Sequence, residues 1–324
     1  MEQNNEHRVD LDLMAEKVNL LRERIGQVIV GQDNVVDLIL TCILADGHVL
    51  LEGVPGVAKT LMARLMAKLI DARFSRIQFT PDLMPTDVLG TTVFNMKTSE
   101  FSFHEGPAFA DVVLVDEINR APAKTQAALF EVMEERQVTI DGTTRRMGDV
   151  YTIIATQNPV EQEGTYKLPE AQLDRFMMKI VMGYPSAEEE VDILSRHQRN
   201  TRLMKLDDVQ PVITRHELLQ LRAMLGKVLV EESLLRYIVD IIQLTRQSKA
   251  VFLGASPRAA VAILQASKAF ALLQGRDFVT PDDIKAITPA VLQHRLVLTA
   301  EAEMQGFTPL SVALTLIDKV QVPT

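Results

Sequence analysis

The stretch HVLLEGVPGVAKTLMARLMAKLI, residues 48–70, decides the fold of this chain. Residues 48–53 are a short apolar segment that predicts a β-strand, and the part from Lys59 onward predicts an amphipathic helix. The apolar face of that helix comprises Met62, Leu65, Met66, Leu69 and Ile70. Two glycines, Gly53 and Gly56, are available to the loop where positive φ or close backbone approach is needed. A strand, a loop and a helix in this order can present backbone N–H groups and the helix dipole to a phosphate.

The loop departs from the strict phosphate-binding pattern at one position. That pattern is a glycine, four residues, and then Gly-Lys-Ser or Gly-Lys-Thr. Gly53 opens the loop and Lys59-Thr60 close it, but Ala58 stands where the second glycine belongs. We expect Ala58 to lie where the chain is already turning into the helix, so that a negative φ suffices and a methyl group is tolerated. The alternative is an ordinary glycine-containing turn that binds no ligand.

A nucleotide-binding loop assigns a role to each of these residues. Lys59 would reach the β- and γ-phosphates of ATP, and Thr60 would be a ligand of Mg²⁺. The expected contacts to the nucleotide are Gly53, Val54, Pro55, Gly56, Val57, Ala58, Lys59, Thr60 and Leu61.

An acidic pair, Asp116-Glu117, ends a second apolar run, ADVVLVDE at 110–117. Its consecutive aliphatic residues are typical of a strand buried on both faces, and ligands of open parallel sheets bind at the carboxyl ends of such strands. We expect Asp116 to hold the Mg²⁺ ion, largely through water, and Glu117 to activate the attacking water as a general base. A solvated strand end is the alternative, and the lysine-threonine loop upstream argues against it.

Three further polar residues are candidates for the same chemistry. Asn158 ends the strand at 150–158, where a neutral amide could orient the water, although Asn-Pro is also a common turn. Arg175 precedes the strand at 176–183 and is either an ion-pair partner of Asp174 or a finger for a neighbour's γ-phosphate. Arg258 lies in the first turn of a predicted helix, an unfavourable place for a cation, so that either a phosphate or a nearby carboxylate would compensate it.

The pattern along the chain predicts two domains. Strands at 48–53, 73–80, 110–117, 150–158 and 176–183 alternate with helices, which indicates a parallel sheet covered on both faces. Segments 90–108 and 136–149 predict two inserted hairpins, the second turning at Asp141-Gly142. After Pro185 the chain is all-helical. We expect a disordered tail at 1–9, an α/β core at 10–185 and a helical domain at 186–324.

Composition narrows the class of protein. The chain of 324 residues has a formal charge of −9, from 34 basic and 43 acidic residues, which argues against a surface built to bind nucleic acid. A single cysteine, Cys42, allows no internal disulfide, and neither a signal peptide nor a membrane-spanning run is visible. We expect a cytoplasmic protein with no membrane insertion. The six histidines show no ligand spacing, so Mg²⁺ with ATP is the only metal expected.

A set of motifs resembles the MoxR family of AAA+ ATPases. The motifs are GVPGVAKT, FTPDLMPTDVLG, VLVDEINRAP, ATQNP, EAQLDRF and GASPRA, and the likeness runs in order from about residue 12 to the C-terminus. The variant loop with Ala58 is typical of that family when it occurs together with DEINRAP and LDRF. The family has an α/β ATPase core of strand order 5-1-4-3-2, a helical lid, and nucleotides between adjacent subunits of a ring, usually a hexamer.

The resemblance also implies residue roles. Asn158 matches the sensor-1 position, Arg175 the arginine finger that acts on the neighbouring subunit, and Arg258 the sensor-2 arginine. Val30, Gly31 and Gln32 match the stretch that borders the adenine. Whether Arg258 acts on its own or a neighbour's nucleotide stays open, and Arg120 is a candidate for the subunit interface.

Two functions of different class remain open at this point. The first is a chaperone-like ATPase that remodels or matures protein complexes, with a von Willebrand factor A domain protein as partner, as the resemblance implies. The second is a DNA-translocating or helicase-like motor, with Lys97, Arg145 and Arg146 near the hairpin tips. The acidic balance favours the first. A nucleotide sensor without hydrolysis is a third alternative, which an intact Glu117 and Arg175 argue against.

Overall fold

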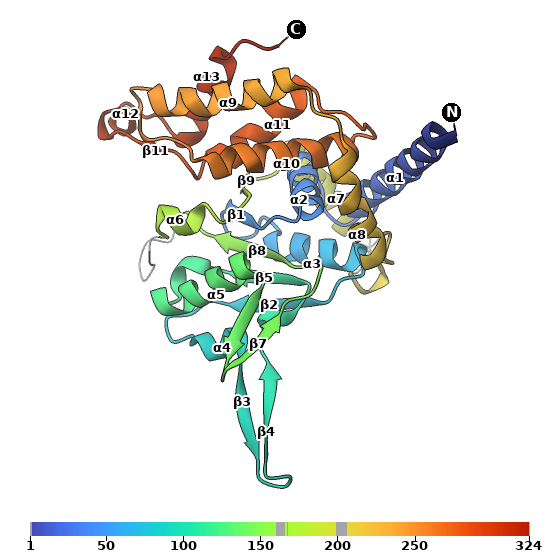
Figure 1. Ribbon diagram of the computed structural model, residues 1–324, viewed down its shortest axis with the longest axis vertical. Helices are drawn as coiled ribbons and strands as arrows, with labels where there is room; N and C mark the ends of the chain where they lie inside the picture. Colours follow the sequence, from blue (N-terminus) through green and yellow to red (C-terminus); the bar gives the residue numbers. More distant parts are fainter. Residues whose placement is uncertain (1, 160–165, 167, 199–205, 324) are drawn as a thin grey trace.

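The computed structural model describes residues 2–159, 166, 168–198 and 206–323. Within these residues the central sheet is five-stranded and parallel, in the order β2-β5-β8-β1-β9 (Figure 1). Its strands are β1 Val49–Gly53, β2 Phe74–Gln78, β5 Val112–Asp116, β8 Thr152–Gln157 and β9 Met178–Met182. Counted along the chain, this is the order 5-1-4-3-2, so the predicted fold class is confirmed.

Helices cover both faces of the sheet, and the alternation of side chains along β5 shows how. Val112 and Leu114 belong to an apolar cluster with helices α2 (Asp33–Leu44) and α3 (Lys59–Leu69). Val113 and Val115 face the other way, into a cluster with α5 (Ala123–Glu135). Because successive residues of a strand point to opposite faces, each face of the sheet has its own core. All five residues of β5 are buried, as its aliphatic sequence predicts.

Strand register brings polar residues together at one edge. Gln78 on β2 pairs with Asp116 on β5, and Val115 of β5 pairs with Ala155 of β8. On the other side of β8, Glu52 of β1 pairs with Gln157. The loop after β1, the acidic pair after β5 and the end of β8 therefore lie at the same carboxyl edge, where parallel sheets bind ligands.

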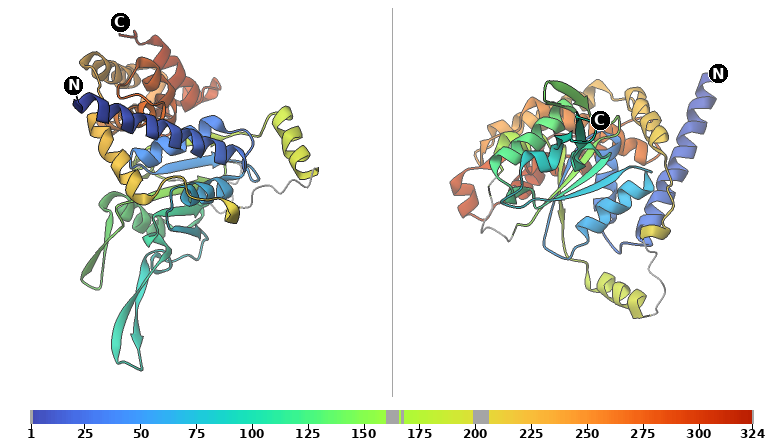
Figure 2. Two further views of the ribbon diagram at one scale, coloured as in Figure 1. Left: turned by 90° about the vertical axis from the view of Figure 1, so that its right-hand side faces the viewer. Right: turned by 90° about the horizontal axis from the view of Figure 1, so that it is seen from below.

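Both predicted hairpins are present. Strand β3 (Gly90–Asn95) pairs with β4 (Glu100–Glu105), and β6 (Gln137–Ile140) pairs with β7 (Thr143–Arg146). Asp141 and Gly142 both have positive φ, 52° and 74°, as a tight two-residue hairpin turn requires. The β3–β4 hairpin projects far from the rest of the molecule (Figures 1 and 2).

The C-terminal part is a helical lid that lies on the opposite side of the sheet from the hairpins (Figure 1). It contains α9 Glu232–Gln247, α10 Pro257–Leu273, α11 Pro281–Leu292, α12 Ala300–Met304, α13 Pro309–Lys319 and a ribbon of β10 Val251–Leu253 with β11 Val297–Leu298. Buried residues of α10 and α11 belong to the same apolar cluster as α2 and α3, so the lid packs directly on the core.

The other described elements connect these parts. They are the helices α1 Glu2–Gly26, α4 Pro85–Leu89, α6 Glu170–Leu173, α7 Ala187–Gln198 and α8 Arg215–Met224, and the 3₁₀ turns Pro107–Phe109, Ile118–Arg120, Leu206–Asp208 and Leu225–Lys227. None of the described helices is long and apolar enough to span a membrane.

The structure differs from the sequence-based domain bounds in two places. Helix α1 begins at Glu2, where a disordered tail is expected up to residue 9; the segment contains neither glycine nor proline to stop the helix. The chain does become helical after Pro185, but α8 still packs on the core. Arg222 of α8 donates to the carbonyl of Ile43 at 2.8 Å and forms an ion pair with Asp46 at 2.6 Å. These contacts place α8 against the core.

Candidate active site

The two glycines of the loop after β1 are needed for different reasons. Gly56 has φ of +90°, a conformation that side chains strongly disfavour. Gly53 does not have positive φ, but a Cβ there would lie 2.7 Å from the carbonyl oxygen of Met182 on the neighbouring strand. The loop thus uses one glycine for conformation and the other for close approach.

Ala58 contradicts the expectation that a negative φ suffices there. Its φ and ψ are 62° and 23°, in the left-handed region, and it is the N-cap of α3. A left-handed residue at this point lets the loop curl so that successive N–H groups face one concavity, as anion-binding nests do. The conformation that the strict pattern assigns to glycine is therefore kept, at a steric cost of about 1–2 kcal/mol for alanine.

Lys59 and Thr60 begin the helix directly behind this loop. The Nζ atom of Lys59 donates to the carbonyl oxygens of Gly53 and, at 3.3 Å, of Val54, so the side chain folds back over the loop. Thr60 is half-buried and faces the same pocket as Lys59. Both residues line the pocket beside the loop after β1.

Asp116 is held by two groups from neighbouring strands. Its carboxylate is buried, with Oδ2 accepting from Arg76 Nε at 2.6 Å and Oδ1 accepting from Thr156 Oγ1 at 3.1 Å. These contacts fix the carboxylate at the strand end, opposite the loop.

Glu117 has a left-handed backbone, with φ of 57°, which directs its side chain toward the pocket. Its Oε2 accepts from Gln78 Nε2 at 2.8 Å and from Arg120 Nη1 at 3.1 Å. Its backbone N–H donates to Thr156 Oγ1 at 3.1 Å. Arg120, which the resemblance suggested for the subunit interface, thus contacts the expected general base of its own subunit.

These groups line one pocket of about 460 Å³. Its walls include most of the predicted phosphate loop, both acidic residues and the mostly buried Asn158. The structure therefore brings together the predicted loop, base, metal ligand and amide. Its lining residues are Pro55, Gly56, Val57, Ala58, Lys59, Thr60, Leu61, Arg76, Gln78, Asp116, Glu117, Thr156 and Asn158.

Three lining residues were not predicted from the sequence: Arg76, Gln78 and Thr156. A signal for two of them existed. Arg76 and Gln78 alternate with buried Ile77 on strand β2, and the order 5-1-4-3-2 places that strand beside the acidic pair. Polar residues alternating near the end of that strand are candidates for this pocket.

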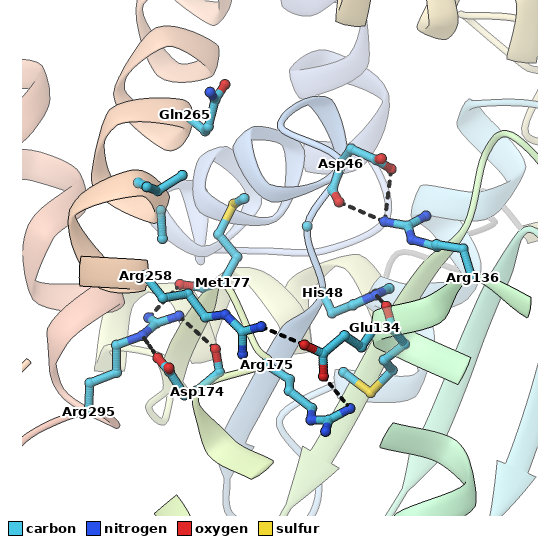
Figure 3. A pocket seen from close by; sticks show the side chains of 14 residues that line it. Asp46, His48, Glu134, Arg136, Asp174, Arg175, Met177, Arg258, Gln265 and Arg295 are labelled. Atoms are coloured by element: carbon cyan, nitrogen blue, oxygen red, sulfur yellow. Dashed lines mark hydrogen bonds and ion pairs between the residues drawn. The ribbon is translucent and has the colours of Figure 1, made fainter. Parts of the chain in front are cut away.

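Arg175 and Arg258 lie outside this pocket, together, on a different face. Both bind the carboxylate of Glu134 near the end of α5: Arg175 Nη1 at 2.8 Å from Oε2, and Arg258 Nη2 at 2.6 Å from Oε1 (Figure 3). The hydrogen bond from Arg258, followed by the charge of Arg175, lowers the pKa of Glu134. Asp174, the alternative partner of Arg175, instead pairs with Arg295 at 2.6 Å. The nearby carboxylate considered for Arg258 is thus present.

The stretch Val30–Gly31–Gln32 also lies outside the pocket. Gly31 and Gln32 have φ of 68° and 73°, and Gln32 Nε2 donates to the carbonyl of Gly183 at 3.2 Å. A Cβ on Gly31 would lie 2.5 Å from Oε1 of Glu189 in α7. The stretch therefore abuts the start of α7, after strand β9.

The donor set of the pocket fits Mg²⁺ with a nucleotide. Among the described residues, no group of three or more His, Cys, Asp or Glu side chains could hold a metal ion by itself. Thr60 and Asp116 could offer two oxygen atoms to the ion, and Mg²⁺ typically completes such a set with phosphate oxygens and water. A metal here would therefore be bound jointly with a phosphate ligand.

Comparisons with known proteins agree with this chemistry. Residues 48–178 match the ATPase family associated with various cellular activities (AAA), and residues 243–312 match the AAA lid domain. The chain is 44% identical to the chaperone MoxR1 of Mycobacterium tuberculosis, over 96% of this chain and 84% of that protein. It is 48% identical to the uncharacterized protein YeaC of Bacillus subtilis, over 93% of each.

A solved structure shares the whole fold. The crystal structure of a candidate ATPase from Cytophaga hutchinsonii superimposes with a TM-score of 0.91 at 39% identity, covering all of both chains. The ATPase domain, the lid and these relatives show that the protein binds a nucleotide and hydrolyses ATP. The chain belongs to the MoxR family of AAA+ ATPases.

Proposed function

We propose that this protein is a ring-forming ATP-hydrolysing motor, most simply a hexamer, that remodels or matures protein complexes as a chaperone does. One observation carries the proposal: the phosphate-loop pocket holds the base and the metal ligands, whereas Arg175 and Arg258 lie together on a separate face. The resemblance gives both arginines a role at the γ-phosphate. One subunit therefore presents an incomplete site, and its neighbour completes it.

Within the pocket each residue has a definite task. Lys59 and the backbone N–H groups of the loop hold the β- and γ-phosphates, and Thr60 and Asp116 would hold Mg²⁺. When bound, Mg²⁺ neutralises charge on the phosphates and orients them. Glu117 accepts a proton from the attacking water, and Asn158 orients that water. Val30, Gly31 and Gln32 would border the adenine.

The arginine pair would act on the nucleotide of the next subunit. In this structure both guanidinium groups converge on one carboxylate, Glu134, much as they would converge on a phosphate. Since Arg175 and Arg258 share this partner, we assign both to the same interface, so that Arg258 also acts in trans. An arginine supplied to a γ-phosphate commonly accelerates hydrolysis by about 10³–10⁵.

In this proposal the client on which the motor acts is a protein rather than a nucleic acid. The projecting β3–β4 hairpin exposes Phe94, Met96 and Phe101, which suit an apolar protein surface better than a phosphate backbone. Arg145, a candidate DNA contact, instead lies over the Phe103 ring at 4.0 Å and donates to the carbonyl of Thr143. The relative MoxR1 is named a chaperone.

The identity of the partner is inferred from the resemblance alone. We propose a protein with a von Willebrand factor A domain as client or cofactor of the motor. Because the motor consumes ATP, we place it in the cytoplasm.

Mixed rings test the division of the site between subunits. Lys59→Ala should abolish nucleotide binding, and Arg175→Ala should abolish hydrolysis while ATP binding persists. Mixing the two variants should restore part of the ATPase rate, because an intact pocket then meets an intact arginine at some interfaces. An unchanged, inactive mixture that still forms rings, as judged by light scattering, would contradict action in trans.

A further inference from the structure

Three consecutive lid residues after α11 hold the segment that carries Arg175. Gln293 Nε2 donates to the carbonyl of Lys179 at 2.5 Å, and His294 Nε2 donates to the carbonyl of Phe176 at 3.0 Å. Arg295 Nη1 donates to the carbonyl of Met177 at 3.0 Å. Burial lowers the pKa of His294 far below its usual range, so the ring is neutral and its Nε2 carries the proton.

Arg295 is the centre of this connection, because all five of its N–H groups have acceptors. Nε donates to Asp174 Oδ1 at 2.6 Å, and Nη1 donates to the carbonyls of Met177 and Val291 at 3.0 and 2.6 Å. Nη2 donates to the carbonyls of Asp174 and Phe176 at 3.2 and 2.7 Å. The side chain is only 3% exposed. A buried charge is tolerated when every donor is satisfied, and the guanidinium of Arg295 binds the backbone on both sides of Arg175.

Asp174 extends the connection to the second arginine. While its Oδ1 binds Arg295, its Oδ2 accepts from Ser256 Oγ at 3.3 Å. Ser256 is the N-cap of α10, and Arg258 lies in the first turn of that helix. The backbone segments that carry Arg175 and Arg258 are thus linked through Asp174 and Arg295. The guanidinium groups of the two arginines meet at Glu134 (Figure 3).

We propose that Arg295 is a positioning residue for the arginine pair, through which the lid of one subunit sets the arginines that act on its neighbour's nucleotide. The inference rests on the proposed action in trans. It adds a route by which a lid movement in one subunit changes hydrolysis in the next. Placement matters because an error of about 1 Å at a reacting centre can cost on the order of 100-fold in rate.

Position 295 requires a planar guanidinium group, which only arginine has among the amino acids. Lysine would keep the positive charge beside Asp174 but could not donate at the same time to carbonyls on both sides of Arg175. Arg295→Lys should therefore retain the fold and lose rate. A matched control is Arg276, another lid arginine, which pairs with Asp283 at 2.7 Å inside the lid and is not among the groups that bind residues 174–179 in the described structure.

The first measurement is ATPase activity and ATP binding of full-length Arg295→Met, Arg295→Lys and Arg276→Met. We expect the two Arg295 variants to lose at least about tenfold in kcat while the Kd for ATP changes less than about twofold, the pattern of a lost transition-state contact. Arg276→Met should lower Tm and leave kcat per assembled ring unchanged. A wild-type kcat for Arg295→Lys would overturn the inference.

The second measurement separates positioning from a general loss of structure. Mixed with Lys59→Ala, Arg295→Lys subunits should regain activity, because the Lys59→Ala subunits supply correctly placed arginines. Mixed with Arg175→Ala, they should not, because neither subunit then has a placed finger. The mixture of Arg175→Ala with Lys59→Ala is the reference. If that reference mixture recovers activity but Arg295→Lys mixed with Lys59→Ala does not, the role of Arg295 alone is overturned. If neither of these two mixtures recovers activity, the action in trans is overturned, and this inference with it.

Discussion

Arg76 Nε lies 2.6 Å from Asp116 Oδ2, across the adjacent strands β2 and β5. The carboxylate is almost fully buried, whereas the guanidinium is about half exposed. Arg76 thus supplies a positive charge to a metal-ligand candidate, within the pocket where Mg²⁺ and a nucleotide are proposed to bind. The pair compensates the buried negative charge of Asp116.

Replacing Arg76 by Met should therefore destabilise the nucleotide-free protein more than the loaded one. Asp116 would lose its ion pair, at a cost of about 1 kcal/mol for a pair with one exposed partner. Mg²⁺ with ATP would compensate the carboxylate instead. Thermal unfolding with and without Mg-ATP measures this, and an equal loss of Tm in both states would contradict it.

Ala58→Gly should leave the protein as stable as the wild type or more so, by up to about 1 kcal/mol. The substitution removes the strain of a left-handed alanine and adds backbone freedom to the unfolded chain, and the first effect is larger. Ala67→Gly, in the interior of the same helix, is the matched control and should destabilise by about 1 kcal/mol. Urea unfolding compares the two. A destabilised Ala58→Gly would mean that the left-handed conformation carries no strain.

Glu117→Gln should keep ATP binding and lose on the order of 100-fold or more in kcat, because the amide cannot accept the proton of the attacking water. Glu135→Gln, an exposed residue at the end of α5, is the control and should be unaffected. Equilibrium binding and steady-state ATPase assays check both. Substantial turnover by Glu117→Gln would identify another base.

The same variant gives the most direct view of the client. Glu117→Gln loaded with ATP should retain its client during a pull-down from native lysate. The pull-down is carried out with and without nuclease, and the bound material is identified by mass spectrometry. A protein with a von Willebrand factor A domain is the expected result. Nuclease-sensitive nucleic acid in its place would favour the translocation alternative.

Stability should fall at acidic pH through Glu217. The hydrogen bond from Lys17, followed by the backbone N–H of Thr214, lowers the pKa of Glu217 to about 2. A carboxyl with a lowered pKa in the folded state stabilises the protein above its unfolded pKa, near 4.5, and loses that contribution as the pH falls toward 2. Since the carboxyl is about one-third exposed, solvent screens the effect to below about 1 kcal/mol. Glu217→Gln should show a smaller decrease of Tm between pH 5 and 3 than the wild type, and an identical decrease would contradict this assignment.

Local patterns in the sequence predicted the strands and hairpins, because strands and tight turns are decided by residues that are neighbours in the sequence. The buried aliphatic run before Asp116 predicted β5, and Asp141-Gly142 predicted the turn of the second hairpin. The parallel sheet then determined that the loop after β1 and the acidic pair share an edge. The strand order itself came from the family resemblance.

Contacts between distant elements could not be predicted in this way. The partner of Arg175 is Glu134, on another element, and the adjacent Asp174 is directed to Arg295 in the lid. Such pairs depend on the packing of α5 and the lid against the sheet, which no local pattern encodes. The φ of Ala58 was predicted wrongly because the residue was expected to lie already in the turn of the helix, whereas it is the left-handed N-cap that precedes α3.

The left-handed backbone of Glu117 sets stability and activity against each other at a single residue. Glycine would adopt φ of 57° without steric cost, whereas a side chain there costs about 1–2 kcal/mol. The position therefore stores free energy that the fold could recover only by discarding the proton acceptor. A screen that ranks variants of this protein by thermal resistance alone would favour the loss of Glu117, the residue proposed here as the general base, so any engineering for robustness must hold residue 117 fixed.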